Sequence, residues 1–318
     1  MSDYRPETLC LHAGQSPDPT THARALPIYQ TSSYTFDSTE HAARLFDLAE
    51  FGNIYTRLMN PTTDCWEKRL AALEGGTGAL GTSSGMAAIF LAVTNVCSAG
   101  DHIVSSASLY GGTETLFRYT MKQFGVETTF ISDMDADKVS AAITDKTKLV
   151  YLESIGNPKG DVLDIQSICD AAHAKGVAVF MDNTFAPLIC KPISHGVDVV
   201  VHSCTKWIGG HGTSIGGVIV DAGSFDWGNG RYPEFTTPDE SYHGICYWEA
   251  LKAVPGMGNV AFILKARVQG MRNMGMCPSP FNAFMFTQGL ETLHLRMPRH
   301  CENALALAEW LQQHELVD

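Results

Sequence analysis

The sequence predicts an α/β protein built on a mostly parallel β-sheet that is sandwiched by helices. Six short segments rich in Val, Ile, Phe and Thr alternate with helical patterns between residues 102 and 221. These segments are largely continuous apolar runs, which is typical of strands buried on both faces. Strands that alternate with helices indicate parallel pairing through crossover connections.

The expected elements follow one another in a simple order. The first 60 residues are rich in Tyr, Thr, Pro and Asn, and we expect them to be irregular apart from a helical pattern at 39–50. After Pro61 an amphipathic helix is predicted, and Gly75 and Gly76 provide its stop signal. The predicted strands lie at 102–106, 126–131, 148–153, 177–182, 197–202 and 216–221.

Helical patterns fill most gaps between the strands, for example at 164–176, and they continue to the end of the chain. A segment at 222–248 interrupts this alternation with many Gly, Pro and aromatic residues. We expect a long irregular loop there. Loops of that length inside a compact domain are often functional.

Composition narrows the class of protein. The 318 residues carry a formal charge of −12 without a Lys/Arg block, so nucleic acid and anionic membranes are not expected partners. The nine cysteines are scattered without a C-x-x-C pair, and no apolar run is long enough to span a membrane or serve as a signal segment. We expect a cytoplasmic protein without a metal site.

A literal G-x-G-x-x-G motif spans Gly76, Gly78 and Gly81. In the dinucleotide-binding fingerprint a strand precedes this motif and a helix opens on its last glycines. Here a helical pattern precedes it, and the next helix is expected only near Gly85. A dinucleotide site is therefore not predicted.

A helix start follows in the segment G-T-S-S-G-M-A-A-I-F, where Ser83, Ser84, Gly85 and Met86 precede an apolar helical run. The free N–H groups and the dipole of such a helix can bind phosphate or another anion. An ordinary serine N-cap explains the same residues equally well. The motif alone does not separate these two interpretations.

A lysine and an aspartate lie at the ends of predicted strands. Asp182 ends the strand V-A-V-F-M-D, and Lys206 follows V-D-V-V-V-H with Ser203 and Thr205 beside it. Separately, the aspartate could cap a turn, the lysine could extend to solvent, and Tyr110 after an earlier strand could be a buried aromatic. Together with the predicted anion site, they meet at the carboxyl ends of one sheet, where ligands bind.

Pyridoxal phosphate needs this combination of groups. It takes a lysine for a Schiff base, an acidic partner for the pyridinium nitrogen and donors for its phosphate. The acid keeps the ring nitrogen protonated, so that the ring can stabilise a carbanion. We therefore predict that Lys206, Asp182 and the helix start at Gly85 bind pyridoxal 5'-phosphate (PLP).

At these residues the sequence resembles the Cys/Met-metabolism family of PLP-dependent enzymes. S-C-T-K fits the family's S-x-[ST]-K motif, and the resemblance continues through Y-T-R-L-M-N-P-T, S-S-G-M, S-L-Y-G-G, E-S-I-G-N-P and M-D-N-T-F. It implies the PLP-dependent transferase fold (fold type I, aspartate aminotransferase-like). It also implies an N-terminal arm (1–60) that reaches the neighbouring active site, a large PLP-binding domain (61–260), and a helical connection to a truncated C-terminal domain (261–318).

The resemblance assigns roles to single residues. Lys206 would be the Schiff-base lysine, Asp182 would contact the pyridinium, and Tyr110 would stack on the ring and help proton transfer. Asn157 would lie near the ring oxygen. Gly85, Met86, Ser203 and Thr205 would hold the phosphate, and Ser84 would also bind the cofactor. Tyr55 and Arg57 would reach the phosphate of a neighbouring subunit in a homodimer or homotetramer.

Segment 222–248, which ends in S-Y-H-G-I-C-Y-W-E, resembles the O-acetylhomoserine sulfhydrylases. That likeness implies replacement of the acetate of O-acetylhomoserine by sulfide or methanethiol, giving homocysteine or methionine. Methionine γ-lyase and cystathionine γ-synthase or γ-lyase activities are the nearest alternatives. Gly112 stands where methionine γ-lyases typically have a cysteine, which argues against that lyase.

Members of this family continue well beyond residue 318, and neither Arg296 nor Arg299 matches the arginine that binds the substrate carboxylate. We therefore assign no carboxylate ligand, and a non-catalytic scaffold with the same fold is the alternative from another class. The presence of Lys206 and Asp182 argues against it. A nucleotide-dependent oxidoreductase is a further alternative, weakened by the misplaced glycine motif.

Overall fold

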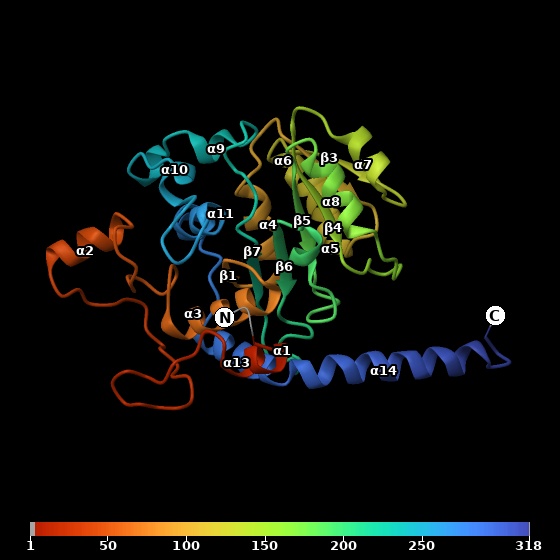
Figure 1. The fold of residues 1–318 in the computed structure, drawn as a ribbon, viewed down its shortest axis with the longest axis horizontal. Helices are drawn as coiled ribbons and strands as arrows, with labels where there is room; N and C mark the ends of the chain where they lie inside the picture. Colours follow the sequence, from red (N-terminus) through yellow and green to blue (C-terminus); the bar gives the residue numbers. More distant parts are fainter. Residues whose placement is uncertain (1–3, 318) are drawn as a thin grey trace.

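The computed structural model describes residues 4–317, which form a seven-stranded sheet with helices on both faces (Figure 1). The strands are β1 (Gly78–Thr82), β2 (His102–Ser106), β3 (Glu127–Ile131), β4 (Thr147–Glu153), β5 (Ala178–Asp182), β6 (Val199–Ser203) and β7 (Gly217–Asp221). Their order is β1-β7-β6-β5-β4-β2-β3, and only β7 runs antiparallel to its neighbours. The predicted α/β class with a mostly parallel sheet is confirmed.

All six predicted strands are present, but the sequence analysis missed β1. Glycine is depleted in strands, and β1 contains both Gly78 and Gly81. The structure gives the reason for one of these glycines: a Cβ at Gly81 would lie 2.4 Å from the ring of Trp66. The G-x-G-x-x-G motif therefore runs into a strand packed closely on a helix, instead of forming a phosphate-binding turn.

The helices confirm most of the predicted helical segments. One helix, Pro6–His12, lies in the region expected to be irregular, and the pattern at 39–50 forms a shorter helix. The α-helices are α1 (Pro6–His12), α2 (Thr39–Phe46), α3 (Pro61–Glu74), α4 (Gly85–Thr94), α5 (Gly111–Thr115), α6 (Met121–Gln123), α7 (Ala136–Ala142), α8 (Ile165–His173), α9 (Pro233–Thr236), α10 (Tyr247–Leu251), α11 (Ala261–Lys265), α12 (Arg272–Met274), α13 (Pro280–Glu291) and α14 (Leu293–Gln312). The π-helical and 3-10 segments are η1 (Leu116–Thr120), η2 (Pro192–His195), η3 (Glu240–Tyr242) and η4 (Ala266–Met271).

Two hydrophobic cores lie on the two faces of the sheet. On one face, α4, α11 and η4 pack on Val199, Val201 and Ile219 of the central strands. On the other face, α1, α3, α8 and α13 pack on the alternate residues Val200 and Val220. Each central strand is thus buried on both sides, as its continuous apolar sequence predicts.

Segment 222–248 differs from the expected irregular loop. It contains α9, η3 and the start of α10, and its aromatic residues Trp227, Tyr232 and Phe235 are fully buried. Trp227 stacks on Phe235 and on Phe262 of α11, each at a centroid distance of 5.0 Å. Aromatic side chains of this size bury large areas, so the segment is part of a core.

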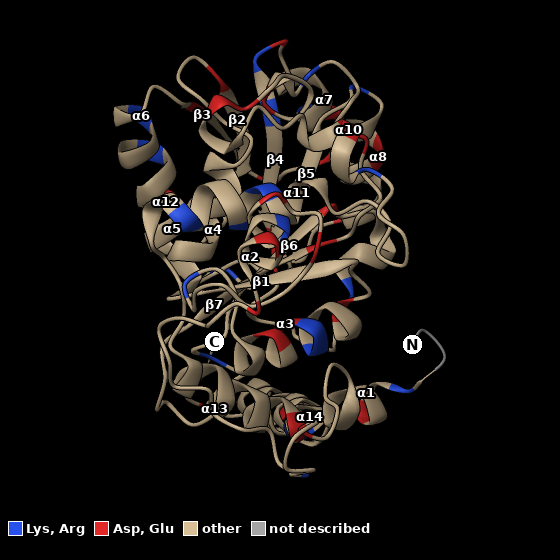
Figure 2. Cartoon of the chain, turned by 90° about the vertical axis from the view of Figure 1, so that its left-hand side faces the viewer, with Lys and Arg blue, Asp and Glu red and all other residues tan. Residues whose placement is uncertain are grey.

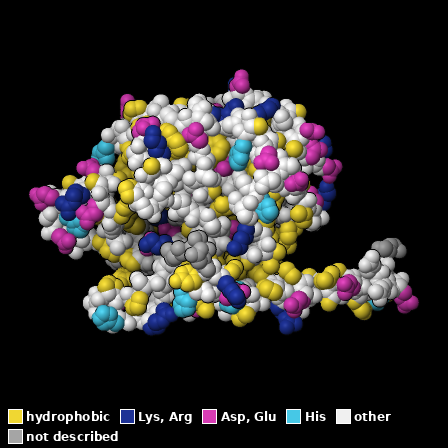
Figure 3. Space-filling view, viewed as in Figure 1, with side chains coloured by type: hydrophobic (Ala, Val, Ile, Leu, Met, Phe, Trp, Pro, Cys, Tyr) yellow, Lys and Arg dark blue, Asp and Glu magenta, His cyan; other side chains and the backbone are white. Residues whose placement is uncertain are grey.

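Helix α14 packs its first turns on the body through Leu293 and Met297 and then extends away from it (Figures 1 and 3). Leu305, Leu307 and Trp310 on its later turns are exposed.

Lys and Arg residues are spread over many elements (Figure 2). Among residues 4–317 no helix has both the length and the apolar character required to cross a membrane.

Candidate active site

A cavity of about 400 Å³ lies at the carboxyl ends of β4, β5 and β6, against the start of α4. This is the place where ligands bind in open α/β sheets. Most of the residues predicted from the sequence meet there although they come from distant parts of the chain. The cavity is lined by Ser84, Gly85, Met86, Tyr110, Asn157, Asp182, Ser203, Thr205 and Lys206.

Lys206 lies in a tight turn after β6. Its N–H donates to the Ser203 carbonyl (3.1 Å), and its own carbonyl accepts from the N–H of Gly210 (2.8 Å). Gly210 has a φ of +74°, a conformation that glycine adopts without strain. Lys206 is exposed to the cavity, and no side chain among residues 4–317 pairs with its Nζ. The amine is therefore available to a ligand.

Asp182 ends β5 and faces the same cavity. Its Oδ1 accepts the N–H of Thr184 (2.8 Å), and within the described chain no lysine or arginine forms an ion pair with it. Burial raises the pKa of this carboxyl, and the bonds from Thr184 oppose that shift. A cationic group in the cavity would stabilise its charged form.

The start of α4 is both a serine N-cap and a helix start with free N–H groups, so it agrees with both interpretations of the serine motif. The Ser84 hydroxyl accepts the N–H of Ala87 (3.0 Å), so it is an N-cap. The N–H groups of Gly85 and Met86 precede that bond and belong to the first turn, where no helical carbonyl can accept them. A Cβ at Gly85 would lie 2.6 Å from the Ser203 Cβ, so α4 and β6 approach closely only because residue 85 is glycine.

Glu153 is a cavity residue that the sequence analysis missed. It ends β4 directly beside Asp182 in the sheet, and its Oε1 accepts the N–H of Tyr110 (2.7 Å). Burial, with the nearby charge of Asp182, raises the pKa of Glu153 to about 8, and hydrogen bonds from Tyr110 and Asn157 oppose the shift. The signal was present in the sequence, because Glu153 ends its strand just as Asp182 does.

Thr184 is a second residue that the sequence did not single out. Its hydroxyl accepts the N–H of Ser203 (2.7 Å) while its own N–H donates to Asp182. It therefore ties the end of β5 to the end of β6.

The buried side chain of His202, in β6, contacts α3. Its Nε2 lies 2.7 Å from Glu74 Oε1.

Tyr55 and Arg57 do not line the cavity of their own chain. Tyr55 is exposed, and the Arg57 guanidinium lies over its ring, 5.3 Å from the centroid. Arg57 Nη1 also donates to the carbonyl of Arg272 (2.8 Å). The two side chains form one small cluster, separate from the other predicted ligands.

A lysine, a half-buried carboxylate and an open helix start converge at one edge of the sheet. This set of groups suits an enzyme cofactor that carries a phosphate, a protonated ring nitrogen and an aldehyde. The sequence matches the family described as Cys/Met metabolism PLP-dependent enzymes over residues 7–318. The chain belongs to this family.

Individual relatives extend the comparison. The chain is 55% identical to an O-acetyl-L-homoserine sulfhydrylase of Leptospira meyeri over 99% of its own length and 72% of the relative. It is 51% identical to a homocysteine synthase of Schizosaccharomyces pombe, over 98% of this chain and 72% of that one. A solved structure described as an O-acetylhomoserine (thiol)-lyase of Campylobacter jejuni, which carries N'-pyridoxyl-lysine-5'-monophosphate, matches with a TM-score of 0.93 and 38% identity, over 98% of this chain and 77% of that one.

The cavity fits PLP. Asp182 is a half-buried carboxylate without a cationic partner in the described residues, and a protonated pyridine nitrogen would supply one. The first N–H groups of α4 suit a phosphate, and the Lys206 amine suits an aldehyde. These residues would hold the ring nitrogen, the phosphate and the aldehyde carbon respectively.

Proposed function

We propose that the protein catalyses γ-replacement on O-acetyl-L-homoserine, in which sulfide or methanethiol replaces acetate and homocysteine or methionine is formed. The observation that carries this proposal is the 55% identity to an O-acetyl-L-homoserine sulfhydrylase over 99% of the chain. The fold and the cofactor-binding residues alone would suit several reactions of this family.

The proposed roles follow from where the side chains lie. When bound, PLP supplies an electron sink that stabilises negative charge on substrate carbon. Lys206 would move protons at Cα and then at Cβ, because its amine is the basic group in the cavity that has no protein partner. Tyr110 lines the same cavity and would assist this proton transfer. Asp182 would keep the ring nitrogen protonated.

We further propose that the functional unit is at least a dimer with shared sites. Arg57 and Tyr55 form a cluster outside their own cavity, and a guanidinium offers a two-pronged contact to phosphate. They would bind the phosphate in a neighbouring subunit as part of an N-terminal arm (1–60). The division into that arm, a large domain (61–260) and a helical region (261–318), and a cytoplasmic location, stay predictions.

An assay of the two competing reactions tests the proposed activity. Purified protein is incubated with PLP and O-acetyl-L-homoserine plus sulfide, and homocysteine is measured. α-Ketobutyrate release from methionine is measured in parallel. We expect the first rate to exceed the second. The reverse order would assign the protein to the γ-lyases, and the absence of both reactions in a protein with bound PLP would support a non-catalytic scaffold.

A further inference from the structure

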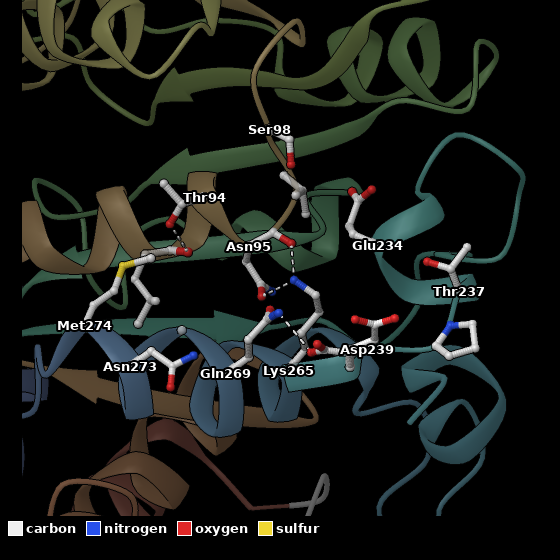
Figure 4. A pocket seen from close by; sticks show the side chains of 15 residues that line it. Thr94, Asn95, Ser98, Glu234, Thr237, Asp239, Lys265, Gln269, Asn273 and Met274 are labelled. Carbon is white, nitrogen blue, oxygen red and sulfur yellow. Dashed lines mark hydrogen bonds between the residues drawn. The ribbon is translucent and has the colours of Figure 1, made fainter. Parts of the chain in front are cut away.

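A second cavity, of about 440 Å³, lies beside the C-terminal end of α4 (Figure 4). Its wall combines the end of α4, the segment from α9 to η3, and the helical run from α11 to α12. The first turns of α4 line the catalytic cavity, whereas Leu91, Thr94 and Asn95 near its end line the second one. The two cavities share no residue.

Lys265 is the one lysine in the wall of this cavity, and its side chain is buried with 4% exposed. Its Nζ donates to the backbone carbonyl of Asn95 (2.9 Å) and to Asn95 Oδ1 (3.3 Å). No carboxylate of residues 4–317 forms an ion pair with it, and burial lowers its pKa to about 8. An ammonium group has three N–H donors, so one is left without a protein acceptor in the described chain.

The carboxylates of Glu234, Asp239 and Glu240 line the same cavity, and the first two differ in what they already bind. Asp239 Oδ2 accepts from Tyr247 (2.8 Å) and Gln269 (2.9 Å), so this oxygen is occupied. Glu234 pairs through Oε2 with Lys148 (3.2 Å), while its Oε1 is buried without a hydrogen-bond partner among residues 4–317. Figure 4 shows the Lys265 amine directed at Asn95, with Glu234 and Asp239 on the neighbouring wall of the cavity.

We propose that this cavity binds a small α-amino acid, whose carboxylate accepts from Lys265 and whose ammonium group donates to Glu234. An anion alone would be repelled by the carboxylates of Glu234, Asp239 and Glu240. A cation alone would be repelled by Lys265, which is buried and pairs with no carboxylate in the described part of the chain. A zwitterion satisfies both open groups, and the volume falls within the range of small-molecule sites.

Calorimetric titration of the PLP-loaded protein with L-alanine tests the proposal, with absorbance followed in parallel. Binding beside the cofactor changes the visible spectrum, whereas binding in the second cavity leaves it unchanged. We expect an absorbance-silent binding event that Lys265→Met weakens at least tenfold and Glu234→Gln weakens severalfold. Lys252→Met, which changes an exposed lysine paired with Glu249, is the matched control and retains the event.

Acetate and methylamine, each carrying one half of the zwitterion, should bind at least tenfold more weakly than L-alanine. Acetate binding as tight as that of L-alanine would show an anion site and overturn the proposal. So would equal silent binding in the wild type and in Lys265→Met, or its absence from the wild type. If Lys265→Met does not fold, the comparison of Glu234→Gln with the wild type decides: unchanged binding overturns the proposal.

Discussion

Glu153 and Asp182 lie directly opposite each other at the carboxyl ends of the neighbouring strands β4 and β5. Burial raises the pKa of both carboxyls, and each lines the catalytic cavity. Their contacts differ, because Glu153 accepts the N–H of Tyr110 and Asp182 accepts that of Thr184. We therefore expect Asp182 to face the cofactor and Glu153 to hold the loop that carries Tyr110.

The pKa of Glu153 predicts a pH-dependent stability difference. A glutamate has a pKa of about 4.3 in an unfolded chain, whereas that of Glu153 in the fold is about 8. Between these values the folded state binds more protons, so the contribution of Glu153 to stability falls as the pH rises. Glu153→Gln lacks this titration and keeps an oxygen that can accept the Tyr110 N–H.

Urea unfolding of the cofactor-free proteins at several pH values across that window is the measurement. Relative to the wild type, Glu153→Gln should gain free energy of unfolding as the pH is raised. A difference between the two proteins that does not change with pH would mean that Glu153 is charged throughout the window in the folded state.

Asp182→Ala removes the carboxylate that would keep the ring nitrogen protonated. We expect the variant to fold, with loss of γ-replacement activity by about two orders of magnitude or more, as for other losses of electrostatic stabilisation. Circular dichroism reports the fold, and a homocysteine assay reports the rate. Activity within a few-fold of the wild type would contradict the role given to Asp182.

Gly85→Ala tests the close approach of α4 to β6. The added Cβ would lie 2.6 Å from the Ser203 Cβ, so one element must shift, at a cost of about 1–3 kcal/mol. We also expect weaker retention of PLP, because the shift moves the N–H groups proposed to hold its phosphate. In the control Gly111→Ala the added Cβ meets no atom within 4 Å. Equal stability and PLP retention in the two variants would argue against a tight helix start at Gly85.

Mixed dimers test the proposed sharing of sites. Arg57→Ala and Lys206→Ala chains are each expected to be cofactor-poor or inactive alone. If Arg57 completes the partner's site, then one site of each mixed dimer has both residues intact, and PLP absorbance and activity return. If mixing restores nothing, Arg57 acts within its own chain or not at all.

The sequence predicted that Lys206 and Asp182 meet at one edge of the sheet, and both line the same cavity. A lysine and an aspartate after apolar runs were informative because parallel strands bring their carboxyl ends together. Glu153 follows the same rule, but it was not predicted because no motif accompanies it as the S-C-T-K segment accompanies Lys206. Tyr55 and Arg57 are proposed to act at a neighbouring subunit, and the pattern of a single chain does not place such a contact.

Tertiary packing explains the errors in the predicted fold. Strand β1 was missed because local propensity disfavours glycine, whereas the close packing of Trp66 requires it at Gly81. The Gly and Pro residues of segment 222–248 predicted a loop. Its aromatic residues instead pack on Phe262, more than twenty residues later in the chain, and such a contact leaves no periodic signal within the segment.

Lys206 is proposed to carry the cofactor, and chemical trapping tests this role most directly. PLP-loaded protein is reduced with borohydride, and the modified peptide is identified by mass spectrometry. We predict one pyridoxyl phosphate group per chain, on Lys206, and none in Lys206→Ala. Modification at another residue, such as the buried low-pKa Lys265, with Lys206 unmodified, would contradict the claim.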